Sequence, residues 1–428
     1  MTILRAAIFH TPRNPFLEAK ALAAFADGAL AVDRGKVAAS GDYGEVRKAY
    51  PNADVRDLRG GYIVPGFIDT HVHFPQVRIL GGLGYSLLDW LEQLTLPEEA
   101  RLADAAYAAT IAREFTCALA AHGTTTALVF GSHFAAATAA LFDAAAERGL
   151  RVFSGLVLSD RSVRPELNQK PAAAYRDTLA LIDHFPRYAV TPRFALSASE
   201  AMLDVCGAVM RERPDALFTT HINENLREIE EVGRLFPSAG DYLAVYERFG
   251  LIGENSVLAH NVHASDDELR RLAEAGASIA HCPSSNAALG SGNFPMSRHI
   301  EAGVRFALGT DVGGGTGFGM MKESLQAYLM QRVAARPNVL SPAQMLYLAT
   351  RAGAEALGIE DETGDFAPGK AADFVYLRPA EASVLAGVLK HAVDQPPERA
   401  LAALFTLAEA GDIEEVRISD HAVFHRGD

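Results

Sequence analysis

The 428-residue chain is poor in cysteine and has no cluster of basic residues. Its three cysteines, Cys117, Cys206 and Cys282, are too few and too widely spaced for a disulfide framework or a Cys-x-x-Cys zinc site. Such scarcity of cysteine indicates a protein of the reducing cytoplasm. The formal net charge is −14 and no run of lysine and arginine is present. This composition argues against a protein that binds nucleic acid through its phosphates.

Long apolar runs are also absent. No stretch approaches the roughly 18 consecutive apolar residues of a membrane-spanning helix, and residues 1–16 lack the apolar core of a signal peptide. We therefore expect no membrane partner. Hydrophobic residues nevertheless make up 49% of the chain. This content is enough to bury the core of one large domain and a smaller one.

From residue 62 onward, short runs of β-forming residues alternate with longer segments of helical periodicity. This alternation predicts an α/β protein of parallel strands joined by crossover helices. Eight such strands fit a closed (β/α)8 TIM-like barrel, whose active site is built at the carboxyl ends of the strands. The strands are expected at 62–68, 125–130, 151–158, 188–195, 216–220, 256–260, 277–281 and 304–310.

Strand-forming segments flank the predicted barrel on both sides. They lie within residues 1–60, which include a turn at 33–36, and again at 371–377 and 416–425. We expect the two chain ends to form one small composite β domain, residues 1–61 and 366–428. The barrel would then be the catalytic domain, residues 62–365. The connection 74–98 after the first barrel strand is unusually long, and long loops at this face of a barrel are often lids.

Histidines and an aspartate recur at the ends of the predicted strands. His71 and His73 lie two residues apart in an extended segment, so both side chains point the same way and can reach one metal ion. His221 follows the fifth strand, His260 ends the sixth and Asp311 follows the eighth. In a barrel these positions surround a single opening. They therefore predict a metal site.

The donor set indicates which metal the site would hold. Neutral imidazoles with one carboxylate suit a zinc ion (Zn2+), with iron(II) (Fe2+) as the alternative. Two-metal barrels commonly need a bridging lysine at the end of the fourth strand, but that end reads Thr191-Pro192-Arg193. Lys170 is the only lysine between residues 120 and 220, and we place it in a loop. One metal ion per chain is therefore expected.

A metal-activated water also needs groups that handle protons. Glu224 lies three residues after His221, close enough to face a substrate atom beside the metal. Its alternative interpretation is a first-turn glutamate that favours the dipole of the following helix. Asp311 can accept the proton of the attacking water, and His260 can hydrogen-bond the nucleophile or serve as a further ligand. No role is assigned to His281.

Taken together, these motifs resemble those of the amidohydrolase superfamily and, within it, the guanine deaminases. The resemblance spans nearly the whole chain. Its substrate-specific part rests on Gln76, Arg193 and Phe194. The matching stretches include 71–76, 88–91, 97–99, 191–194, 221–225, 259–261, 281–286 and 309–311.

The resemblance implies hydrolytic deamination of guanine to xanthine and ammonia, by a homodimer. The implied metal ligands are His71, His73, His221 and Asp311. The implied catalytic residues are Glu224, Asp311 and His260. The implied purine contacts are Gln76, Arg193 and Phe194, with His221, Glu224 and Asp311 also touching the substrate. Without the resemblance, Arg193 would be interpreted as a salt bridge at the barrel rim and Phe194 as part of the core.

Two alternatives stay open from the sequence. A second mononuclear hydrolase on the same scaffold could act on another N-heterocycle, such as an adenosine derivative, cytosine or a triazine. A noncatalytic relative could use the barrel as an assembly scaffold. A noncatalytic relative would be expected to lack a metal ligand or a proton-transfer group, whereas this sequence contains all of these residues.

Overall fold

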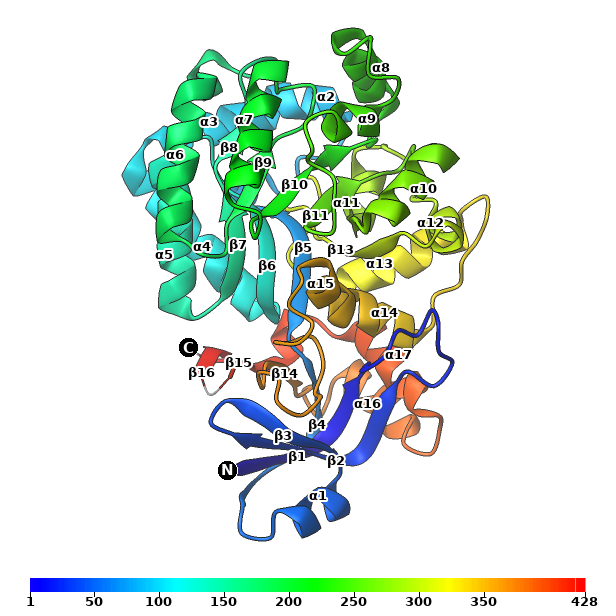
Figure 1. Ribbon diagram of the computed structural model, residues 1–428. Coiled ribbons are helices and arrows are strands. Elements are labelled where there is room, and N and C mark those ends of the chain that lie inside the picture. Colours follow the sequence, from blue (N-terminus) through cyan, green and yellow to red (C-terminus); the bar gives the residue numbers. More distant parts are fainter. Residues whose placement is uncertain (420, 428) are drawn as a thin grey trace.

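The computed structural model describes residues 1–419 and 421–427. It contains a barrel surrounded by helices and a separate sheet of seven strands. In Figure 1 the sheet lies below the barrel, and both chain termini lie on the side of the sheet. The first barrel strand rises directly out of this sheet, so the carboxyl ends of the barrel strands lie at the opposite end of the molecule.

The barrel strands are short, parallel and almost completely buried. They are β5 (Phe67–His73), β6 (Thr124–Phe130), β7 (Arg151–Gly155), β8 (Val157–Leu158), β9 (Ala189–Pro192), β10 (Leu217–Ile222), β11 (Ser256–His260), β12 (Ser278–His281) and β13 (Arg305–Leu308). Strands β5 to β7 form one ladder and β8 to β13 another. Burial on both faces explains why these segments read as continuous apolar runs.

Backbone contacts join the two ladders into a ring. Ser154 on β7 pairs in parallel with Tyr188, the residue before β9. On the other side, the N–H of Asp311 donates to the carbonyl oxygen of His71 at 2.8 Å, and the N–H of His73 donates to that of Val312 at 2.9 Å. Strands β7 and β8 are separated by one residue and together occupy one of the eight strand positions of the barrel. The predicted (β/α)8 barrel is therefore confirmed.

The prediction of the first barrel strand at 62–68 is wrong. Residues up to Pro65 belong to β4 (Asp54–Pro65), which pairs with β14 (Phe374–Leu377) in the seven-stranded sheet. The barrel strand begins only at Phe67. Gly66 separates the two, and a Cβ atom there would lie 2.3 Å from the Thr125 hydroxyl oxygen. Because β4 ends and β5 begins in buried apolar residues, the hydrophobic pattern could not reveal the change of sheet.

Helices follow the barrel strands in sequence and cover the barrel (Figure 1). They are α4 (Ala105–Ala121), α5 (Ala135–Arg148), α6 (Pro171–His184), α7 (Glu200–Glu212), α8 (Leu226–Leu235), α9 (Tyr242–Glu247), α10 (Asp266–Ala275), α11 (Pro283–Ala288), α12 (Met296–Ala302), α13 (Met320–Arg332), α14 (Pro342–Ala349) and α15 (Arg351–Ala356). The spacing of Ser265 with Glu268 and of Ser341 with Gln344 predicts capping boxes, and both are present. The sequence also predicts one helix at 343–357, but the structure breaks it at Thr350 into α14 and α15.

Both ends of the chain contribute to the seven-stranded sheet. Its order is β16-β15-β14-β4-β1-β2-β3. The remaining strands are β1 (Thr2–His10), β2 (Ala23–Asp33), β3 (Lys36–Asp42), β15 (Ile413–Ile418) and β16 (His421–His425), and the helices beside them are α1 (Tyr43–Ala49), α16 (Val384–His391) and α17 (Pro397–Leu407). Along β1, Ile3 packs on one face while Leu4, Ala6 and Ile8 pack on the other, as the two-residue period of a strand requires. The domain bounds at 61/62 and 365/366 stay a prediction.

The long connection after β5 folds into short helical pieces at the open end of the barrel (Figure 1). They are η1 (Phe74–Ile79), α2 (Leu87–Trp90), η2 (Leu91–Thr95), α3 (Leu96–Ala100) and η3 (Arg101–Ala103); two further 3-10 turns are η4 (Pro165–Leu167) and η5 (Ala410–Asp412). Across the described residues 1–419 and 421–427, no helix combines the length and apolar character needed to cross a membrane.

Candidate active site

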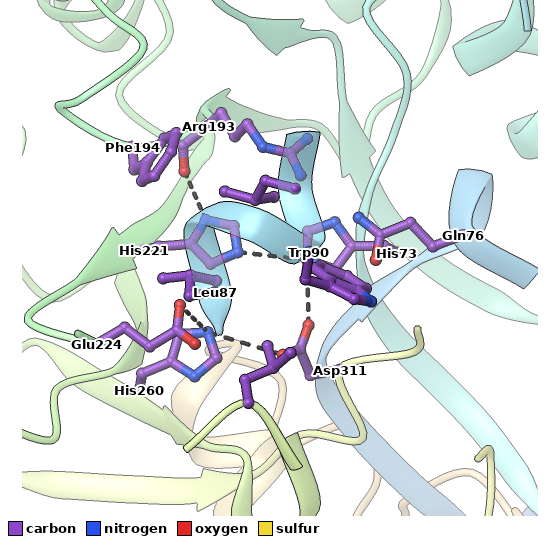
Figure 2. A pocket seen from close by; sticks show the side chains of 12 residues that line it. His73, Gln76, Leu87, Trp90, Arg193, Phe194, His221, Glu224, His260 and Asp311 are labelled. Atoms are coloured by element: carbon purple, nitrogen blue, oxygen red, sulfur yellow. Dashed lines mark hydrogen bonds and ion pairs between the residues drawn. The ribbon is translucent and has the colours of Figure 1, made fainter. Parts of the chain in front are cut away.

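Four side chains predicted to bind metal converge at the carboxyl ends of the barrel strands. The Nε2 atom of His73 lies 3.2 Å from that of His71 and 3.3 Å from that of His221. The Oδ1 atom of Asp311 lies 3.3 Å and 3.2 Å from the Nε2 atoms of His71 and His73. In Figure 2, His73, His221 and Asp311 face a common space. Strands β5 and β10 and the end of β13 thus bring the four groups together.

The spacing of these atoms fits one metal ion. Ligand atoms at about 2.0–2.1 Å from a tetrahedral zinc ion are roughly 3.3 Å apart, close to the separations above. The Nδ1 atom of His221 lies 2.6 Å from the backbone carbonyl oxygen of Arg193. Because a carbonyl can only accept, Nδ1 carries the hydrogen and the Nε2 lone pair is free for a metal. The residues His71, His73 and His221 form a group that could hold a metal ion.

Burial keeps the ligand rings in the form that metal binding needs. It lowers the pKa of His73 to about 4 and shifts the pKa values of His71 and His221 in the same direction. The three rings are therefore neutral at pH 7. Cys282 also lies near His71 and Asp311. Burial raises the pKa of its thiol well above the usual value, so in this structure it is a neutral, buried side chain.

Glu224 and His260 lie beside each other next to this cluster (Figure 2). One carboxyl oxygen of Glu224, Oε1, accepts a hydrogen bond from the Ser291 hydroxyl at 2.9 Å. The other, Oε2, lies 3.5 Å from Nε2 of His260, which is itself 3.8 Å from Oδ2 of Asp311. Burial, with repulsion by Asp311, raises the pKa of Glu224 to about 8. This carboxyl group can therefore hold a proton at neutral pH.

Backbone strain gathers at the same opening. Asn223, His260, Asn261 and Asp311 all have φ between 48° and 73°, a region that non-glycine residues rarely adopt. They follow or end β10, β11 and β13. Residues held in this region cost on the order of 1–3 kcal/mol each and gather at functional sites. The barrel thus holds these side chains in place at an energetic cost.

A second group of side chains lines the other part of the pocket. Arg193 and Phe194 follow β9, and Gln76 lies in η1 after β5. Both polar side chains contact Glu99 of α3. The Nη1 atom of Arg193 lies 2.8 Å and 2.6 Å from the two carboxylate oxygens, and the Gln76 amide donates to Oε1 at 2.9 Å. His133 Nδ1 lies 3.4 Å from the same carboxylate.

One pocket connects both groups. Its apolar cover comes from the long connection after β5, which contributes Leu87, Trp90 and Leu91, and from Leu289. Residues of the connection 74–98 thus line the pocket, and its action as a lid stays a prediction. The polar lining comprises His73, Gln76, Arg193, His221, Glu224, His260 and Asp311. The groups predicted to bind a metal, transfer protons and contact a ring therefore face the same small space.

A family model for the amidohydrolase family matches residues 62–423 of the chain. The chain belongs to the amidohydrolase family. Residues 28–53, in the sheet beside the barrel, match a bacterial imidazolonepropionase-like composite domain. These two matches cover the barrel, with β14 to β16 that follow it, and part of the N-terminal strands.

Several relatives of this amidohydrolase are similar over their full length. It is 58% identical to a probable guanine deaminase of Deinococcus radiodurans, over 100% of this chain and 99% of the relative. Its fold matches that of E. coli guanine deaminase with a TM-score of 0.94 at 36% identity, covering 100% of each chain. It also matches guanine deaminase from C. acetobutylicum with guanine bound in the active site, with a TM-score of 0.90 at 25% identity, covering 99% and 100%.

Several residues that support the site of this amidohydrolase were missed by sequence reasoning. Glu99 lies in one of the stretches that carry the resemblance, but no role was predicted for it, although it holds Gln76 and Arg193. His133 follows β6 by three residues, so its strand-end position was an available signal. Asp69 is buried between the two ligand-bearing segments, where it accepts hydrogen bonds from the backbone N–H groups of His71 and Thr310. Ser291 gave no local signal, because its partner Glu224 is 67 positions away.

Proposed function

We propose that this amidohydrolase hydrolyses guanine to xanthine and ammonia. One observation carries the proposal. A group fit to hold a metal ion, a glutamate whose pKa burial raises to about 8, and an arginine–glutamine pair that can donate to a purine all line the same pocket. The guanine deaminases that resemble the chain over its full length support this choice of substrate. The chain also resembles a structure with guanine bound in its active site.

For the metal we propose one zinc ion per chain, held by His71, His73, His221 and Asp311. Neutral histidine rings and a carboxylate at these separations suit zinc, and iron(II) is the alternative. When bound, such an ion supplies Lewis acidity that lowers the pKa of a water molecule toward 7. The fixed tautomer of His221 supports its role as a ligand. We also propose that the protein is a homodimer of the cytoplasm.

We propose that Glu224 and Asp311 move the protons of the reaction. With Ser291 bonded to its Oε1, Glu224 can keep a proton on Oε2 and give it to the ring nitrogen next to C2 of guanine. The Oδ2 atom of Asp311 lies 3.8 Å from Nε2 of His260 and can accept a proton from the attacking water. The proton that Asp311 took from the water then passes through Glu224 to the exocyclic amine, the bond between C2 and this amine breaks, and ammonia leaves. The remaining hydroxyl proton returns to Glu224 as the C2 carbonyl of xanthine forms.

His260, which lies beside Glu224, also assists. Its Nδ1 atom lies 2.9 Å from the amide oxygen of Asn286, so Nδ1 donates to Asn286. The Nε2 atom is buried and has no hydrogen-bond partner among residues 1–419 and 421–427. With Nδ1 donating to Asn286, the Nε2 atom of His260 can accept a hydrogen bond from the entering water. Phe194 would cover one face of the purine ring.

The test is to follow the conversion of guanine to xanthine by ultraviolet absorbance, with ammonia and bound metal measured in the same sample. Rapid turnover with about one zinc ion per chain is expected. Turnover should stop after treatment with a chelator and return when zinc is added. Bound metal without activity toward guanine would contradict the proposal. A panel of an adenosine derivative, cytosine and a triazine would then identify the heterocycle.

A further inference from the structure

Glu99 lies next to the part of the pocket that would hold the purine, where it contacts the lining side chains of Arg193 and Gln76. It lies on α3, outside the barrel strands, and is 2% exposed. Its two oxygens receive Arg193 Nη1 at 2.8 and 2.6 Å and the Gln76 amide at 2.9 Å. Burial opposes the charge of Glu99, but Arg193 outweighs it, and the pKa of Glu99 lies below its usual value. The proposed reaction gives this carboxylate no task.

The contacts of Gln76 allow only one orientation of its amide. Glu99 can only accept a hydrogen bond, so the atom facing it must be Nε2. The backbone N–H of Gly313 can only donate, and it lies 3.0 Å from the other end of the amide, which must be Oε1. Glu99 and Gly313 together therefore prevent the amide from turning over. One N–H of Gln76 remains for a ligand.

Arg193 is held in a similar way. Its Nη1 atom is held by Glu99, so Nε and Nη2 are the guanidinium groups left to donate to a ligand in the pocket that Arg193 lines. Neighbouring His133 adds no charge, because burial lowers its pKa to about 4, and its Nε2 atom lies 3.3 Å from the Ser159 hydroxyl. The group formed by Glu99, Arg193 and Gln76 is therefore electrically neutral. It nevertheless presents mainly hydrogen-bond donors to the ligand.

A surface of fixed donors distinguishes between purines. Guanine carries an acceptor at C6, its carbonyl oxygen, whereas 2,6-diaminopurine carries a donor amine there and has the same amine at C2. We infer that Glu99 is a positioning residue that makes the pocket prefer a 6-oxopurine over a 6-aminopurine. This inference rests on the proposed function, with Arg193 facing the C6 side of the ring. In this inference Glu99 contributes to the selectivity between purines, whereas Glu224 and Asp311 transfer the protons of the reaction.

The substitution Glu99→Gln tests the inference. In this variant one oxygen facing Arg193 Nη1 becomes an amide N–H donor. Two donors then oppose each other, and the ion pair is lost. Losing one charge-assisted hydrogen bond is worth about 1.5–3 kcal/mol, or roughly 10- to 100-fold. We expect the ratio of kcat/KM for guanine to that for 2,6-diaminopurine to fall by about this factor, with a raised KM for guanine and unchanged zinc content.

The ratio separates positioning from a general loss of structure, because a partly unfolded enzyme loses both activities equally. If 2,6-diaminopurine turns over too slowly, its inhibition constant against guanine replaces its kcat/KM. Glu98→Gln is the matched control. Glu98 is the preceding residue on α3 and is also buried, but it accepts hydrogen bonds from Arg101 and Tyr107 instead. The control should keep the wild-type ratio.

A second variant covers the case in which Glu99→Gln does not fold. Glu99→Asp keeps the charge but is shorter by one methylene group, so it cannot hold both Arg193 and Gln76, and an intermediate ratio is expected. A ratio within about threefold of wild type in the folded variant would overturn the inference while leaving guanine deamination intact. A wild-type enzyme that releases no ammonia from guanine would instead overturn the proposed function, and this inference with it.

Discussion

Replacing Glu224 by Gln should separate proton transfer from binding. The amide keeps the size of the carboxyl group and can still accept the hydrogen bond from Ser291 through Oε1. It cannot release or take up a proton. General acid–base catalysis of this kind contributes about 10²- to 10⁴-fold. At about 1.36 kcal/mol per factor of ten, the activation barrier should rise by roughly 2.7–5.5 kcal/mol.

The assay is the initial rate of guanine loss at saturating substrate, on samples whose zinc content and melting temperature are measured first. We expect kcat to fall by about 10²-fold or more, with bound metal and melting temperature close to wild type. Glu230→Gln, which makes the same change on the exposed face of α8, is the control and should keep full activity. Near-wild-type turnover in Glu224→Gln would refute the proton-transfer role of Glu224.

Two further predictions concern groups outside the proton path. Burial raises the pKa of Glu323 from 4.5 to about 8. Glu323 therefore contributes to the free energy of unfolding below pH 4.5, and this contribution is lost as the pH rises to 8. Its size is about 1.4 kcal/mol per unit of pKa shift. The melting temperature of Glu323→Gln relative to wild type should therefore increase from pH 5 to pH 8; a constant difference would contradict the raised pKa. Trp90, the only tryptophan, lines the pocket. Trp90→Ala should raise the KM for guanine about tenfold, equivalent to about 1.4 kcal/mol, with a smaller change in kcat; an unchanged KM would mean that Trp90 does not cover the purine.

The barrel could be predicted because its signals are local. Each barrel strand is a short β-forming run, and each following helix carries its own start or stop residues, such as Ser265. The predicted ligands share one further property, their place at strand ends, and barrel geometry turns that property into a common position. His71, His73, His221 and Asp311 could therefore be placed at one opening before any distance was known.

Where the signal was not local, prediction failed. Gly66 separates a strand of one sheet from a strand of another, yet β4 and β5 are both apolar beside it. The break of the last predicted helix at Thr350 was missed in the same way, since its neighbours on both sides favour helix. In each case the change depends on which element packs against the segment, and the local pattern does not record this.

The sequence by itself determined the fold class, the strand-end histidines and the family resemblance, because hydrophobic periodicity and motif spacing act over a few residues. Only the tertiary structure decided how the pocket is held together. Glu99 and Arg193 are 94 positions apart, and Glu224 and Ser291 are 67 apart. Such pairs form only when the barrel closes and the connection after β5 folds over its opening. The distances between these side chains therefore depend on the tertiary structure and not on the local sequence.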